Sequence, residues 1–224
     1  MNALGFVAAE RREFEGIERL LSGVRRMRAR IDYLAEGQWA GRRVVLAANG
    51  PGPKLAREAV EAVGEVGAWV STGYCGALDA RLAVGDILVA TAVNDWAAVV
   101  PECPAGFLKG RIVSQDRVVN TAWEKRQLAA TGAVAVEMEA AGVAAAAQEQ
   151  GLPFFCIRVV TDGANEDMPM DFNRYRGPDG RFSRGRIALA AIGRPKTLAA
   201  LIRFGRRCER ASIQLGEGLA GCRF

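Results

Sequence analysis

The chain has 224 residues, of which 50% are hydrophobic and 25% are charged, with a net charge of +5. This composition excludes a disordered chain and provides enough apolar residues for one sizeable core. No apolar run reaches the roughly 18 residues of a membrane-spanning helix, and the N-terminus lacks the basic segment and cleavage site of a signal peptide. We therefore expect one domain over residues 1–224 of a cytoplasmic protein.

Hydrophobic periodicity and turn residues predict the elements of the first half of the chain. The first are a strand over residues 3–9, a helix over 13–24 and strands broken by glycine turns over 29–50. A Gly/Pro loop over 49–53, a helix over 54–66 and a strand over 68–73 follow.

The second half alternates in the same way. The predicted order is two strands, a helix, a strand, a helix and a strand, over residues 86–93, 111–116, 121–131, 133–138, 139–151 and 153–162. One or two helices follow over residues 184–215, interrupted at Gly193–Pro195. Apolar, unalternating strands separated by helices are typical of an α/β fold with a buried mixed sheet.

The chain contains five cysteines and no histidine. The cysteines are widely spaced and form no C-x-x-C pair, so we expect reduced, mostly buried thiols and no metal site. The missing histidine excludes Ser-His-Asp and Cys-His catalysis. Acid–base chemistry is left to Asp, Glu, Lys, Tyr or Cys side chains.

Several candidate site residues fall at the ends of predicted strands, where α/β sheets bind ligands: Gly73, Asp116, Glu137–Glu139 and Asp162. Glu139 alone is explained by the preference of acids for helix N-termini, and Asp162 alone by a turn. Together they suit departure of a purine from ribose. An ionised glutamate accepts hydrogen bonds from a ribose diol, and a protonated aspartate donates to the leaving nitrogen.

The segment "VEMEAAGVA", followed by "LPFFCIRVVTD", resembles the nucleoside phosphorylase/nucleosidase family, which includes purine nucleoside phosphorylase, uridine phosphorylase and methylthioadenosine/S-adenosylhomocysteine nucleosidase. Three more segments are similar to the family and keep its order: "ANGPGPKLAREAVEA", "STGYCGALDARLAVGDILVAT" and "CPAGFLKGRIVSQDRVV". The resemblance spans residues 1 to about 170. It implies one three-layer α/β domain with a central mixed, barrel-like sheet flanked by helices, a homo-oligomer, and no metal or organic cofactor.

The resemblance also implies roles for individual residues. Glu139 would hold the ribose hydroxyls, Met138 would pack on the sugar, and Asp162 would protonate or hydrogen-bond the purine at N7. The base would lie near two valines with two polar supports: Val118, Val119, Ser114 and Asp116.

The nucleophile stays open between phosphate and water. Phosphorylases of the family carry a phosphate-binding arginine two residues before the turn glycine, which is Gly73 here, but this chain has Ser71 there. Tyr74 stands where many members carry a hydroxyl-bearing residue. Loss of a fixed cation weakens a phosphate site, although the glycine loop and Lys54 still offer groups to an anion.

Nucleosidases of the family instead carry a glutamate after the first strand that activates water. Glu13 aligns best with this residue and Glu10 is the second candidate, although an acidic helix start also explains both. We favour water over phosphate as the co-substrate.

The segment from about 174 to 224 is predicted to be a basic helical C-terminal extension. It resembles the hopanoid-biosynthesis-associated members, which release adenine from adenosylhopane; soluble adenine nucleosides are the alternative substrates. The stretch from Arg174 to Arg210 is rich in arginine and poor in acids. With its apolar residues, Leu198, Leu201, Ile202 and Phe204, it suits peripheral contact with an anionic membrane, or packing on the core or a second subunit.

Two other classes of function fit parts of the sequence. A non-catalytic nucleoside-binding module does not need an acid, so the presence of Glu139 together with Asp162 argues against it. The basic segment also suits nucleic acid, but no nucleic-acid-binding motif accompanies it, and we expect no such partner.

Overall fold

The computed structural model describes residues 3–103 and 106–224. Its strands are β1 (Leu4–Ala8), β2 (Ser22–Arg26), β3 (Tyr33–Trp39), β4 (Arg42–Ala48), β5 (Ala68–Ala77), β6 (Ile87–Val93), β7 (Trp96–Ala97), β8 (Leu108–Ser114), β9 (Ala135–Glu137) and β10 (Phe154–Asp162). Its helices are η1 (Arg11–Phe14), α1 (Glu15–Glu18), α2 (Pro53–Glu61), α3 (Ala122–Ala129), α4 (Ala140–Glu149), η2 (Phe172–Tyr175), α5 (Arg184–Ile192) and α6 (Pro195–Leu219), where η marks a 3₁₀ helix.

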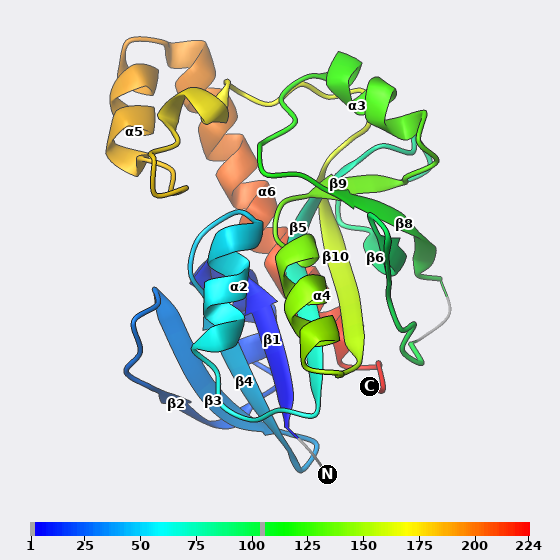
Figure 1. Cartoon of the computed structure of the whole chain (residues 1–224). Helices are drawn as coiled ribbons and strands as arrows, with labels where there is room; N and C mark the ends of the chain where they lie inside the picture. The colour runs from blue at the N-terminus through cyan, green and yellow to red at the C-terminus, as the bar shows by residue number, and fades with distance from the viewer. Residues whose placement is uncertain (1–2, 104–105) are drawn as a thin grey trace.

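The sheet is mixed and partly closed. Strands β5, β9, β8, β6 and β10 form a ring, because β10 pairs with both β5 and β6. Strands β1, β4, β3 and β2 continue from β5 as an open arm, seen at the lower left of Figure 1. Some neighbours run parallel, such as β5 and β10, and others antiparallel, such as β10 and β6. The predicted α/β fold with a barrel-like mixed sheet is confirmed.

Helices cover both faces of this sheet (Figure 1). Val60 of α2 and Val143 of α4 belong to the core on one face, while Ile17 of α1 and Leu215 of α6 belong to the core on the other. Every residue of β10 is buried, as its unalternating apolar sequence predicts for a strand covered on both sides. Among the described residues, no helix combines the length and apolar character needed to cross a bilayer.

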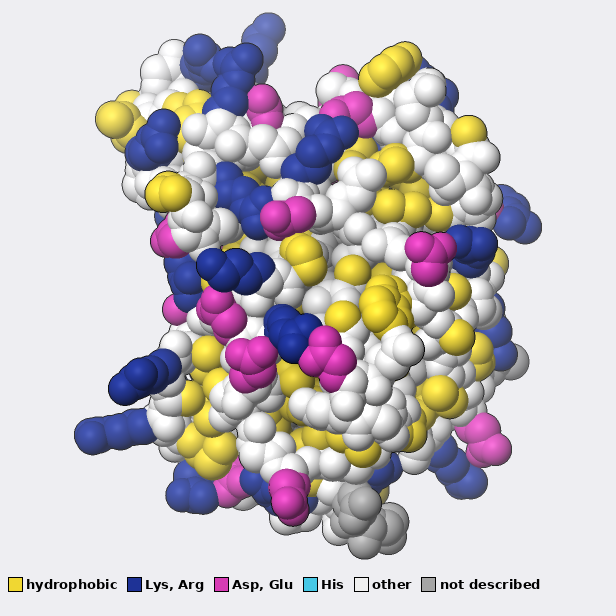
Figure 2. All heavy atoms as spheres, viewed as in Figure 1, with side chains coloured by type: hydrophobic (Ala, Val, Ile, Leu, Met, Phe, Trp, Pro, Cys, Tyr) yellow, Lys and Arg dark blue, Asp and Glu magenta, His cyan; other side chains and the backbone are white. Residues whose placement is uncertain are grey.

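Helix α6 has two parts with different surroundings. Its C-terminal half is packed against α1, where two glycines let the helices touch. A Cβ atom on Gly16 would lie 2.1 Å from the Ser212 carbonyl oxygen, and one on Gly216 would lie 2.2 Å from the Gly16 carbonyl carbon. Its N-terminal part stands with α5 at the upper left of Figure 1, where Figure 2 shows lysine and arginine side chains gathered.

The helix predicted over residues 13–24 is wrong in length. Only the short η1 and the single turn α1 form, and β2 begins at Ser22. Gly23 has a φ of +63°, which favours glycine and ends helical continuation. The apolar positions that suggested a longer helix, such as Phe14 and Ile17, belong to the hydrophobic core on the side of the sheet that α6 covers.

The expectation of five reduced thiols is wrong for two of them. Cys103 and Cys222 form a disulfide, whereas Cys75, Cys156 and Cys208 are free and buried. The bond forms because the C-terminus returns beside the segment before β8, where Glu102 and Arg223 exchange backbone hydrogen bonds of 3.1 and 2.7 Å. A pairing across 119 residues leaves no mark in the local sequence.

Candidate active site

A cavity of about 560 Å³ lies near the ends of β5, β9 and β10. Seven predicted site residues line it: Glu13, Tyr74, Val118, Val119, Met138, Glu139 and Asp162. Residues of η2, α5 and α6 form the outer part of its wall. The structure thus brings these seven side chains together from five segments that are distant in sequence.

Arg158 lies at the centre of the charged groups behind this cavity. Its side chain is fully buried in β10 and pairs with Glu137 and, at 3.4 Å, with Glu139. It also donates to the Ser71 hydroxyl at 2.6 Å and to the Thr72 carbonyl oxygen at 2.8 Å. Burial alone would lower the pKa of Arg158. The carboxylates around it outweigh burial, so its pKa is raised above the usual value and the side chain stays a cation.

Glu13 is held in place from two sides. Its Oε1 accepts a hydrogen bond from the Glu10 amide at 2.9 Å, and its Oε2 accepts one from the Tyr74 amide at 3.0 Å. Gly73 makes this contact possible, because its φ is +124° and a Cβ atom there would lie 2.0 Å from Glu13 Oε2. Burial raises the pKa of Glu13 to about 7; Arg158 opposes this and Glu10 adds to it.

Glu137 and Glu139 have different hydrogen-bond partners at the start of α4. Glu137 Oε2 accepts from the amides of Glu139 and Ala140, both at 2.9 Å, so it caps the helix while it pairs with Arg158. Glu139 makes no cap and accepts instead from the Gly52 amide at 3.2 Å. Burial, followed by the charge of Glu137, raises the pKa of Glu139 to about 8.

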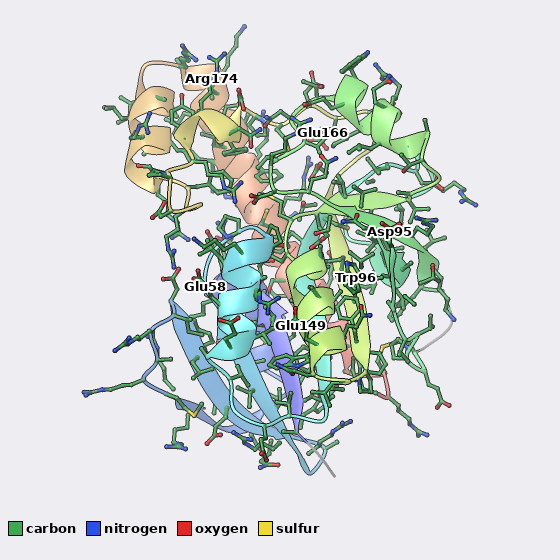
Figure 3. The ribbon with its side chains drawn as sticks, in the orientation of Figure 1. Glu58, Asp95, Trp96, Glu149, Glu166 and Arg174 are labelled. Atoms are coloured by element: carbon green, nitrogen blue, oxygen red, sulfur yellow. A yellow bond between two sulfur atoms is a disulfide. The ribbon has the colours of Figure 1, made fainter. Side chains whose placement is uncertain are left out.

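Asp162 ends β10 beside a buried lysine. Its Oδ1 accepts from the Thr161 hydroxyl at 2.9 Å, and its Oδ2 lies 2.5 Å from Lys125 Nζ. Lys125 also donates to the carbonyl oxygens of Gly163 and Glu166, at 2.7 and 2.9 Å. Glu166, labelled in Figure 3, is itself paired through its side chain with an arginine of α6.

The other predicted residues have mixed placements. Ser114 supports α4, since its hydroxyl accepts from the Ala141 amide at 3.2 Å, and Asp116 pairs with Arg176 at 2.6 Å. Ser71 is fully buried against Arg158, and Lys54 is exposed on α2. Neither Ser71 nor Lys54 lines the cavity.

Sequence reasoning missed Arg158 and Lys125. A charged residue inside the apolar run "FFCIRVVTD" was a usable signal for Arg158, because a buried cation needs a nearby anion. Lys125 lies in a helix with ordinary surface composition, "TAWEKRQLAAT", and nothing in that pattern marks it as buried.

The outer part of the cavity wall is mostly apolar, and Arg184 of α5 is its charged member. Its apolar residues come from η2, α5, α6 and the segment between η2 and α5: Phe172, Phe182, Ile187, Ala188, Ala191, Leu198, Leu201, Ile202 and Phe204. The ring centroid of Phe172 lies 6.4 Å from that of Phe182 and 6.4 Å from that of Phe204, which joins these segments into one wall. The cavity therefore has a charged inner end and an apolar outer end.

Comparison with known proteins identifies the family. The model of the Phosphorylase superfamily matches residues 4–108 and 104–193. The chain belongs to this superfamily. A curated member of similar sequence, the 5'-methylthioadenosine/S-adenosylhomocysteine nucleosidase of Staphylococcus aureus, is 28% identical over 166 residues, which cover 59% of this chain and 68% of that protein.

Solved structures show that this superfamily member has the fold of known nucleosidases. The methylthioadenosine/S-adenosylhomocysteine nucleosidase of Helicobacter pylori with butyl-thio-DADMe-Immucillin-A matches with a TM-score of 0.70 and 21% identity, over 98% of this chain and 96% of that one. The futalosine hydrolase of the same organism matches with a TM-score of 0.70 and 20% identity, over 97% and 95%. At these identities the likeness establishes the fold alone.

Proposed function

We propose that this protein cleaves the N-glycosidic bond of an adenine nucleoside with water and releases adenine. The observation that carries the proposal is the set of three carboxyl groups, Glu13, Glu139 and Asp162, around one cavity at strand ends. The named activity of the Staphylococcus aureus relative supports it.

Each carboxyl group has a separate task. Departure of adenine leaves positive charge on the ribose and negative charge on the base. Asp162 gives a proton to N7 of the base and is left as the carboxylate that pairs with Lys125 at 2.5 Å, and Glu139 accepts hydrogen bonds from the ribose hydroxyls. Glu13 accepts a proton from water as the water oxygen bonds to C1′ and the C1′–N9 bond breaks.

Glu13 suits the role of base better than Glu10. A group with a pKa of about 7 is half ionised near neutral pH, where a general base works best. The Glu10 carboxylate is already engaged, since its Oε2 lies 2.6 Å from Arg12 Nε and 2.8 Å from an arginine of α5.

Phosphate remains the alternative nucleophile. The phosphate-site candidates Ser71 and Lys54 stand outside the cavity wall, but Arg12 and Arg184 line it and are cations that an anion can approach. Adenine release with and without phosphate decides between the two reactions. Release that needs phosphate overturns hydrolysis, and binding without release from any nucleoside identifies a non-catalytic binding module.

For the substrate, we propose an adenine nucleoside with a large apolar 5′ group, such as an adenosyl lipid of the adenosylhopane type. With the ribose held at Glu139, the apolar outer end of the cavity is left for that group. The matching experiment compares kcat/KM for adenosine, methylthioadenosine and an adenosyl lipid. Preference for adenosine over both would contradict this substrate class.

A further inference from the structure

Helix α5 and the first turns of α6 expose apolar side chains. Of the nine large hydrophobic residues exposed in the described part of the chain, four lie here: Leu189 (73% exposed), Ile192 (70%), Ile202 (50%) and Leu198 (39%). Leu189 and Ile192 are three residues apart on α5, and Leu198 and Ile202 are four apart on α6, so each pair shares a helix face. We call this surface the α5–α6 face.

The α5–α6 face is also strongly basic. Between Arg181 and Cys208 the sequence has no acidic residue and eight basic ones: Arg181, Arg184, Arg186, Arg194, Lys196, Arg203, Arg206 and Arg207. Five of these are exposed and make no ion pair with any described residue: Arg186, Arg194, Lys196, Arg203 and Arg206. Figure 2 shows the basic and hydrophobic side chains intermixed on this lobe, at the upper left.

The cavity opens onto the same face. Leu198 and Ile202 are exposed and also line the cavity wall, where Leu201 and Phe204 continue the apolar surface inward. The sequence left these four residues open between a membrane surface and packing on the core or a second subunit, and in the structure all four line the cavity. Leu189 and Ile192 do not line the cavity and are the most exposed of the group.

We propose that the α5–α6 face docks on the surface of an anionic bilayer. Exposed leucine and isoleucine side chains ringed by lysine and arginine are the pattern of interfacial helices. Each basic residue near an anionic surface adds to the electrostatic attraction. In this position the mouth of the cavity meets the bilayer, so an apolar 5′ group reaches the active site without crossing water.

The charge and the exposed apolar residues of the α5–α6 face favour a bilayer over a second copy of the chain or a nucleic acid. A second copy of the chain would place two sets of eight basic residues against each other, which opposes self-association through this face. A nucleic acid would match the charge but would leave Leu189 and Ile192 without an apolar partner. A bilayer surface with anionic headgroups satisfies both features.

The test is sedimentation of the full chain with large vesicles. Wild-type protein should sediment with vesicles of mixed phosphatidylcholine and phosphatidylglycerol, less so at high salt, and should stay in solution with phosphatidylcholine alone. The variants Leu189→Asp/Ile192→Asp and Arg194→Glu/Lys196→Glu should each lose binding at least about tenfold. The matched control Val99→Asp/Val100→Asp changes two exposed valines elsewhere and should bind like wild type.

Three results would overturn the proposal. They are absence of wild-type binding to the anionic vesicles, equal binding by Leu189→Asp/Ile192→Asp, and a wild-type dimer that this double variant dissociates.

The access route for a lipid rests on the proposed function, whereas docking does not. Adenine release from methylthioadenosine, which both double variants should retain, tests function separately. Release without vesicle binding overturns docking alone, and vesicle binding without any release supports docking and overturns the proposed function.

Discussion

Lys125 Nζ lies 2.5 Å from Asp162 Oδ2, and the two side chains are only 1% and 8% exposed. A buried charge that loses its partner costs about 3–5 kcal/mol. We therefore expect Lys125→Met to lower the free energy of unfolding by about that amount. The double variant Lys125→Met/Asp162→Asn should recover much of the loss, because it leaves no unpaired charge. Urea denaturation of wild type, Lys125→Met, Asp162→Asn and the double variant measures the coupling energy of the pair. Additive losses of stability would show that the two side chains do not interact.

Asp162→Asn removes the proposed acid but keeps the shape of the side chain. We expect kcat for adenine release to fall roughly 10²–10⁴-fold, as for loss of a general acid, with a small change in nucleoside affinity. Asp95→Asn, at the exposed turn between β6 and β7 (Figure 3) and outside the cavity wall, is the control and should keep full activity. Unchanged turnover in Asp162→Asn would rule out the assigned role.

The pH dependence of kcat/KM should report Glu13. The base must be ionised, so the rate should rise with pH through about 7, the raised pKa of this buried carboxyl group. The charge of Glu10 raises that pKa, so Glu10→Gln should move the rising limb to lower pH. The profile of initial rates against pH checks both statements.

Glu13→Gln should abolish hydrolysis at every pH, whereas Glu15→Gln, two residues along and exposed, should not. A rising limb that persists unchanged in an active Glu13→Gln protein would assign the base to another residue.

Glu139→Ala should weaken ribose recognition and turnover together, because the same carboxyl group is proposed to hold both ribose hydroxyls. A 2′,3′-dideoxy substrate lacks those hydroxyls and should react slowly with wild type and show little further loss in the variant. Glu149→Ala, at the opposite end of α4 (Figure 3), is the control. The role is wrong if the variant loses equal activity on both substrates.

Gly216→Ala should destabilise the protein by about 1–3 kcal/mol, because the new methyl group would overlap the backbone of Gly16. Gly205→Ala lies on the same helix with nothing near its Cβ position and should stabilise by about 0.5–1 kcal/mol. Thermal unfolding of the two variants gives the comparison. Equal effects would contradict the close contact of α1 and α6.

The parts of the site that the sequence predicted are those with a local cause. The apolar run ending at Asp162 and the short strand before Glu139 each show where a buried strand stops, and the ends of neighbouring strands meet at one edge. The resemblance to a known family then supplied Glu13, which no periodicity distinguishes from other acidic helix starts.

The parts that were missed depend on contacts between distant segments. Arg158 is buried because Glu137 pairs with it across the sheet, and Lys125 because α3 lies against the end of β10. The disulfide and the cavity wall from α5 and α6 likewise join segments far apart in sequence. No window of neighbouring residues contains both members of any of these contacts.

The contact between Gly16 and Gly216 joins the first helix to the last one, 200 residues later in the chain. During synthesis the N-terminal segment with Glu13 leaves the ribosome long before α6 exists. The cavity is completed only when the residues of α6 have also left the ribosome and α6 can pack against α1. A ribosome-bound chain that lacks α6 therefore holds Glu13 on an unfinished surface.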